Sequence, residues 1–162
     1  MTTARRMLLI AITCIGCVGC DQVTKALVRA NVEQGVMYSY LHDTIRLTHA
    51  ENPGAFLSLG ERLPASFRVL LFSVVALGIS AGALVLAFSL RQVTQNQIIG
   101  LALIAAGGIS NWIDRVTNAG HVTDFINIGI GWLRTGIFNI ADMALMSGLA
   151  LCFFIGHGSS PK

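Results

Sequence analysis

Four stretches of mostly apolar residues follow one another along the chain, separated by more polar segments. They cover approximately residues 7–28, 67–90, 98–116 and 136–156. Each stretch is close to the roughly 20 residues that an α-helix needs to cross the hydrocarbon core of a bilayer. The pattern therefore predicts an α-helical integral membrane protein with four transmembrane helices in a single membrane-embedded domain, residues 1–162.

Polar side chains interrupt three of the four stretches, always near one end. They are Asp21 and Lys25 in the first, Asn111, Asp114 and Arg115 in the third, and Asn139 and Asp142 in the fourth. Four crossings place the connections 29–66 and 117–135 on the same side, so all three clusters meet at one membrane face. Polar groups at membrane depth are expensive and usually functional, so the pattern predicts a site at this face.

The two connections on this side carry further signals. Residues Val36–Leu41 and Thr44–Leu47 alternate β-branched or aromatic residues with others, which predicts a small extramembrane β-sheet cap between the first and second helices. Trp132, in the second connection, suits a position at the membrane interface. Glycines within the second and third stretches predict close packing of those helices.

Composition supports this class of protein. Hydrophobic residues make up 54% of the chain and charged residues only 12%, against about 25% charged in an average soluble domain. The formal net charge is +3, and the 11 basic residues are spread along the chain without a basic run. We therefore expect no nucleic-acid partner.

Charge gives conflicting signals about orientation. Lys and Arg are more numerous on the side of the connections, which taken alone would place the termini outside. Arg5 and Arg6, directly before the first apolar stretch, instead resemble a segment that is retained inside the cell. Because Lys25 and Arg115 belong to polar clusters, we discount them and expect both termini to be cytoplasmic.

Two aspartates are candidates for catalysis. Asp124 and Asp142 are flanked by uncharged residues, and neither has a cation next to it in the sequence. Two such carboxylates close together can share one proton, one acting as general base toward a water and the other as acid. This is aspartic-protease chemistry without a metal or cofactor. The alternative is that each carboxylate only reaches the headgroups or bonds to the backbone.

The remaining titratable groups suggest less. Asp114 directly precedes Arg115, which favours a structural ion pair that holds helix ends together. Histidines are scattered, and no G-x-S-x-G sequence is present, so metal-dependent and serine hydrolysis lack their motifs. Cysteines within the first and last stretches are expected to be small buried hydrophobes rather than metal ligands.

Five short motifs occur in an order that resembles the bacterial lipoprotein signal peptidase family, also called signal peptidase II. They are Asp21-Gln22-Val23-Thr24-Lys25, Asn52-Pro53-Gly54-Ala55-Phe56, Asn111-Trp112-Ile113-Asp114-Arg115, Val122-Thr123-Asp124-Phe125 and Phe138-Asn139-Ile140-Ala141-Asp142. Each motif is weak alone, but the set, its order and the four-helix plan are specific together.

The resemblance implies a monomeric inner-membrane aspartic endopeptidase with its active site near the periplasmic face. Its substrates would be prolipoproteins, cleaved just before a diacylglyceryl-modified cysteine, and membrane lipid would surround it. The family's catalytic positions correspond to Asp124 and Asp142. Positions that shape or brace the pocket correspond to Asp21, Lys25, Asn52, Gly54, Asn111, Asp114, Arg115 and Asn139. In the family, the extramembrane sheet and a mobile amphipathic segment hold the substrate, and cyclic peptides of the globomycin type inhibit cleavage.

The chain departs from the family pattern at two places. Ser110 stands where the family usually has glycine, and the Asn52–Phe56 motif is one alanine short. Serine is small enough for a close helix contact, whereas the shorter segment is expected to shift Phe56 and alter substrate fit.

Two other hypotheses remain at this point. In the first, the N-terminus is itself a lipoprotein signal, with Cys20 lipidated and residues 1–19 removed. In the second, the intramembrane aspartates relay protons or cations in a small transporter. Relay carboxylates are expected near the bilayer midplane, however, and here they all lie near one face.

Overall fold

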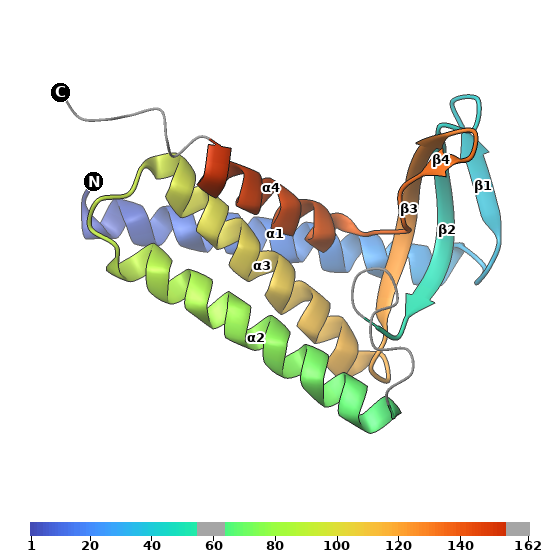
Figure 1. Cartoon of the computed structure of the whole chain (residues 1–162), viewed down its shortest axis with the longest axis horizontal. Coiled ribbons are helices and arrows are strands. Elements are labelled where there is room, and N and C mark those ends of the chain that lie inside the picture. Colours follow the sequence, from blue (N-terminus) through green and yellow to red (C-terminus); the bar gives the residue numbers. More distant parts are fainter. Residues whose placement is uncertain (55–63, 155–162) are drawn as a thin grey trace.

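The computed structural model describes residues 1–54 and 64–154, and it consists of a helix bundle with a small sheet across one end (Figure 1). The helices are α1 (Thr3–Asn31), α2 (Ala65–Ser89), α3 (Gln95–Thr117) and α4 (Ile140–Phe154). The strands are β1 (Met37–Tyr40), β2 (Ile45–Asn52), β3 (Val122–Ile130) and β4 (Leu133–Arg134). They form an antiparallel sheet in the order β1-β2-β3-β4.

Three helices, α1, α2 and α3, are long and apolar enough to cross a membrane. The apolar helix α4 is shorter within the described part of the chain. Many large apolar side chains of α1 and α2 are exposed, as expected for surfaces that face lipid. Most of α3, by contrast, is buried among the other helices, so α3 is the centre of the bundle.

The predicted helices are found, with one correction at the fourth. The sequence placed its start near Gly136, with Asp142 about six residues inside it, whereas α4 begins at Ile140 and Asp142 lies in its first turn. The reason is that residue Phe138 is held in an extended conformation. Its N–H donates to the Ile126 carbonyl, and its own carbonyl accepts from Phe125 and Ile126, so the chain pairs with β3 before it can turn into a helix.

The sheet also differs from the expected one. It was predicted between the first two helices, but β3 and β4 come from the connection between α3 and α4. The register pairs Ala50 of β2 with Asp124 of β3, and Asn52 with Val122. The sheet therefore places one end of β2 and the start of β3 beside the bundle, where the polar clusters lie.

Glycines allow α3 to lie very close to α4. A Cβ atom built on Gly148 would be 2.5 Å from the Gly100 carbonyl oxygen, and one on Gly107 would be 2.5 Å from the Ala141 carbonyl oxygen. The prediction of close packing is thus right for α3. It is wrong for the α2 glycines, Gly78 and Gly82, where a Cβ would meet nothing within 4 Å.

Alanine substitutions test whether these glycine contacts matter for stability. We expect Gly148→Ala to destabilise the protein by about 1–3 kcal/mol, because the added methyl group forces α3 and α4 apart. The matched change Gly78→Ala should be neutral or stabilising by up to about 1 kcal/mol, because alanine favours helix and the site is open. Thermal unfolding in detergent measures both, and equal effects would contradict the assigned contact.

Candidate active site

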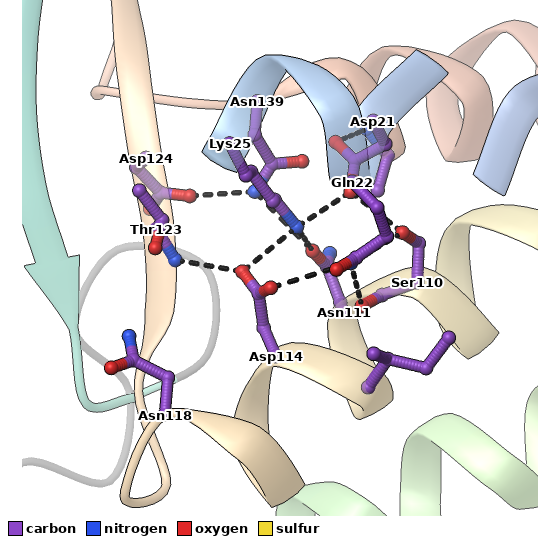
Figure 2. Close-up of polar contacts among 12 residues, drawn as sticks. Asp21, Gln22, Lys25, Ser110, Asn111, Asp114, Asn118, Thr123, Asp124 and Asn139 are labelled. Carbon is purple, nitrogen blue, oxygen red and sulfur yellow. Dashed lines mark hydrogen bonds and ion pairs between the residues drawn. The ribbon is translucent and has the colours of Figure 1, made fainter. Parts of the chain in front are cut away.

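The polar clusters predicted at one membrane face come together where α1, α3, β3 and the start of α4 meet (Figure 2). The two candidate catalytic aspartates enter from different elements, Asp124 from β3 and Asp142 from the first turn of α4. Each of the ten candidate residues except Gly54 makes a side-chain hydrogen bond or ion pair with another of the ten, and Gly54 contacts the set through its backbone.

Asp124 is almost fully buried, with 3% of its surface exposed. Its two carboxylate oxygens each accept a hydrogen bond from an amide, Oδ1 from Asn139 Nδ2 at 2.7 Å and Oδ2 from Asn52 Nδ2 at 2.9 Å. Burial raises the pKa of Asp124 to about 7, and the negative charge of Asp142 adds to this, while the two amides oppose it. Asp124 therefore retains a proton close to neutral pH.

Asp142 is held by a similar pair of donors. Its Oδ1 accepts from Asn111 Nδ2 at 2.9 Å, and its Oδ2 accepts from the backbone N–H of Asn139 at 3.2 Å. The Asn139 side chain in turn accepts from the Asp142 N–H at 2.9 Å, which caps the first turn of α4. Asn139, which is fully buried, thus contacts both aspartates and sets their relative position.

A buried lysine lies behind this pair. Lys25 Nζ is 2.7 Å from Asp21, 3.1 Å from Asp114 and 2.9 Å from the side-chain oxygen of Asn111. Lys25, Asp21 and Asp114 each have no exposed surface. A further cation, Arg29, lies 3.5 Å from Asp114 at the edge of the cluster. The lysine links α1 to α3 through ionic contacts that water does not reach.

The two supporting aspartates also bind the backbone just before each catalytic candidate. Asp21 accepts the N–H of Ala141 at 2.8 Å, one residue before Asp142. Asp114 accepts the N–H of Thr123 at 3.0 Å, one residue before Asp124. The residue before each catalytic candidate is thus hydrogen-bonded through its backbone to the cluster around Lys25.

The predicted pairing of Asp114 with Arg115 is wrong. Within the described ranges, the cations that contact Asp114 are Lys25 and Arg29. Successive residues on a helix point in different directions, and Arg115 points toward the segment after β2, where it donates to the Gly54 carbonyl at 3.1 Å. Its guanidinium also lies 5.8 Å from the centroid of the Phe72 ring.

The segment from Asn52 to Gly54 lies against the site. The Asn52 side chain accepts the N–H of Gly54 at 2.9 Å while its amide donates to Asp124. The expected shift of Phe56 falls on residues 55–63, outside the described residues. In the ranges 1–54 and 64–154, no group of three His, Cys, Asp or Glu side chains is placed to hold a metal ion.

Sequence reasoning did not identify several residues of the network. The Ser110 hydroxyl donates to Asp21 at 2.7 Å, and Gln22 donates to both Ser110 and Asp114. Arg29 donates to the Thr123 hydroxyl at 2.8 Å. Gln22 and Thr123 are polar residues within the family-like motifs, and this position could have indicated that they belong to the network. Arg29, one helical turn after Lys25, had the same spacing from it that Lys25 has from Asp21.

Comparison with known proteins agrees with this arrangement. The family model described as signal peptidase (SPase) II matches residues 13–156. A lipoprotein signal peptidase of Streptococcus pneumoniae is 29% identical over 147 residues, covering 91% of each chain. One of Rhodococcus jostii is 32% identical over 156 residues, covering 93% of this chain and 73% of the relative. A bacterial membrane enzyme solved by the in meso method at 2.3 Å resolution superposes with a TM-score of 0.79 at 25% identity, covering 94% of each chain.

The matches and the apolar helices together show that this is a multi-pass membrane protein and a protease. More particularly, the chain belongs to the signal peptidase II family.

The cluster around Lys25 generates a stability prediction. We expect Lys25→Met to lower the free energy of unfolding by about 3–5 kcal/mol, because buried Asp21 then loses its cation and buried Asp114 keeps only Arg29, at 3.5 Å. Adding Asp114→Asn should restore part of this loss, because one of the two weakly compensated charges is removed. Thermal unfolding of the single and double variants in detergent provides the measurement. Wild-type stability of Lys25→Met, or a double variant less stable than the single one, would contradict the ionic role.

Proposed function

We propose that this protein removes signal peptides from prolipoproteins by an aspartic mechanism in which Asp124 and Asp142 act on the scissile peptide bond. The observation that carries the proposal is the shared bridge of Asn139, which donates to Asp124 through its side chain and to Asp142 through its backbone. Asp124 is buried and Asp142 is half-buried, and two carboxylates held together in this way are suited to carry one proton between them.

In the proposed reaction, Asp124 is the protonated partner and Asp142 the ionised one. Burial holds the pKa of Asp124 near 7, so its proton is available to polarise the substrate carbonyl. Asp142 takes a proton from a water molecule, whose oxygen attacks the carbonyl carbon and forms a tetrahedral intermediate. The proton held by Asp142 then passes to the leaving nitrogen, the C–N bond breaks, and the carbonyl re-forms as its proton returns to Asp124.

The remaining candidates position this pair. Asn52 and Asn111 supply one amide donor to each aspartate, so neither carboxylate carries its charge unsupported. Arg115 holds the carbonyl of Gly54 and thereby the segment that carries Asn52. Lys25, with Asp21 and Asp114, fixes the helices and backbone behind the pair.

The position of the site suits a substrate anchored by lipid. The pair lies where the helix bundle meets the sheet, so a scissile bond near the membrane surface can reach it (Figure 1). We infer cleavage just before a diacylglyceryl-modified cysteine, at the periplasmic face of the inner membrane, with both termini cytoplasmic. We also infer a monomer that cyclic peptides of the globomycin type inhibit.

The two other hypotheses fit the molecule less well. Asp21 directly follows Cys20 within the continuous helix α1 and is buried in the site, so residues 3–19 belong to the same helix as a site residue. Intact mass spectrometry tests the lipidation of Cys20. The proposed relay in a transporter would require solute flux that depends on Asp142, in vesicles that show no peptide cleavage.

The first prediction of this proposal concerns the two aspartates. We expect Asp124→Asn and Asp142→Asn each to abolish cleavage, because an amide can neither accept the proton of water nor supply an acidic one. The assay is cleavage of a diacylglyceryl-modified prolipoprotein by purified protein in detergent with EDTA present. The same carboxylate-to-amide change at exposed Glu33 should leave activity unchanged. Turnover retained by either folded aspartate variant would overturn the assignment.

The second prediction concerns pH. We expect kcat/KM to fall as pH rises through about 7, because Asp124 then loses the proton that the reaction needs. Asn52→Leu removes a donor that favours the ionised form, so the pKa of Asp124 rises further and this limb of the profile moves to higher pH. The change Asn31→Leu, at an exposed residue outside the site, should leave the limb in place. A limb that stays fixed or moves to lower pH in Asn52→Leu would contradict the role of Asp124.

A further inference from the structure

The end of the sheet away from the active site carries a group of exposed apolar residues that the proposed reaction does not use. We call this end the sheet tip and define it as the β1–β2 turn and the β3–β4 hairpin, residues 40–45 and 128–134. The register joins them, because Ile45 pairs with both Tyr40 and Ile128. The Gly129 N–H also donates to the Thr44 carbonyl at 2.9 Å, so the two turns form one unit.

The exposure of the sheet tip is unusual for a surface in water. Trp132 is 92% exposed, Ile130 80%, and Leu41 and Leu133 68% each. Leu41 also has a positive φ of 51°, in a turn where Asn or Gly would be favoured. An apolar residue held in a strained turn with its side chain exposed indicates a contact with something apolar.

The length of α1 indicates where the sheet lies relative to the bilayer. The 29 residues of α1 form a helix about 44 Å long, which exceeds the hydrocarbon core of about 30 Å, so at least one end of α1 reaches the headgroup layer. The strand β1 begins six residues after α1 ends. Figure 1 shows the strands crossing the direction of the helices at the end of the bundle, with both turns projecting past α4. The sheet tip therefore extends sideways over the lipid that surrounds the bundle.

The charges at the sheet tip fit the same surroundings. Asp43 accepts from Arg46 at 2.6 Å and 2.5 Å, and Arg134 donates to the Asp43 carbonyl at 2.7 Å. The hydrogen bonds from Arg46 hold the pKa of Asp43 well below its usual range, so this carboxyl stays ionised. Two guanidinium groups face one carboxylate, which leaves an excess of positive charge beside the exposed aromatic and aliphatic groups. This combination suits a phospholipid interface.

We propose that the sheet tip inserts Trp132 and its apolar neighbours into the headgroup region of the bilayer, forming a second attachment to the membrane beside the helix bundle. The active site lies at the other end of β3. Six residues separate Asp124 from Ile130, or about 20 Å along an extended strand. An attachment at the sheet tip holds the sheet, and with it Asp124, at a constant height above the membrane surface. The proposal concerns lipid contact and does not depend on the proposed cleavage reaction.

Tryptophan fluorescence tests the proposal, because the chain has two tryptophans, Trp112 and Trp132. In Trp112→Phe only Trp132 emits, and Trp132→Phe provides the spectrum of Trp112 for subtraction from the wild type. The protein is placed one molecule per nanodisc, in phosphatidylcholine and phosphatidylglycerol whose acyl chains carry bromine either near the headgroup or near the methyl end. We expect blue-shifted Trp132 emission, strong quenching by bromine near the headgroup, weak quenching by deep bromine and little quenching by aqueous iodide.

Added charges give a matched control. In the Trp112→Phe background, Ile130→Asp should reduce quenching by brominated lipid and increase quenching by iodide, because a carboxylate at the sheet tip opposes insertion. Met37→Asp places the same charge on β1 outside the sheet tip and should change neither value. Quenching of Trp132 by iodide alone in the parent protein would place the sheet tip in water and overturn the proposal. Protection from both quenchers would mean that protein covers the sheet tip, which also overturns it.

Discussion

The structure depends on one buried cation, Lys25, held between Asp21 and Asp114. Burying charged groups is unfavourable unless their geometry is good and their remaining hydrogen-bonding positions are filled. Here they are filled: Asp21 also accepts from Ser110 and from the Ala141 N–H, and Asp114 also accepts from the Thr123 N–H. The cluster thus specifies how α1 lies on α3, since a slip of either helix would leave a charge without a partner.

The same contacts explain how a membrane protein places two candidate catalytic carboxylates accurately. Asp124 lies on the strand β3 and Asp142 on the helix α4. The residue before each of them donates its backbone N–H to an aspartate of the cluster around Lys25. Two asparagines fill the space between the charged groups. Asn111 accepts from Lys25 and donates to Asp142, so it connects the ionic cluster to the candidate catalytic pair without adding charge. An amide suits this role because it is donor and acceptor at once.

Sequence reasoning identified the features that depend on local patterns. Apolar runs located the helices to within a few residues, and the absence of a neighbouring cation singled out Asp124 and Asp142. The features that it missed depend on pairing across the chain. From the sequence, Phe138 is expected inside an apolar span. Its hydrogen bonds with Ile126 instead hold it in an extended segment before α4. Likewise, Asp114 and Arg115 are adjacent in sequence, but their different directions on α3 give them different partners.

Ser110 shows how the chain accommodates a departure from its family pattern. The position needs a small side chain, because it lies fully buried where α1 meets α3 and its carbonyl accepts from Gln22 at 3.1 Å. A hydroxyl adds little volume to a glycine, yet it supplies a donor to Asp21 at 2.7 Å and an acceptor for Gln22 at 3.0 Å. A buried hydroxyl with both a donor and an acceptor contact avoids the penalty of an unpaired polar group. The Ser110 hydroxyl therefore adds two hydrogen bonds to the ionic cluster around Lys25, and neither of them involves Asp124 or Asp142.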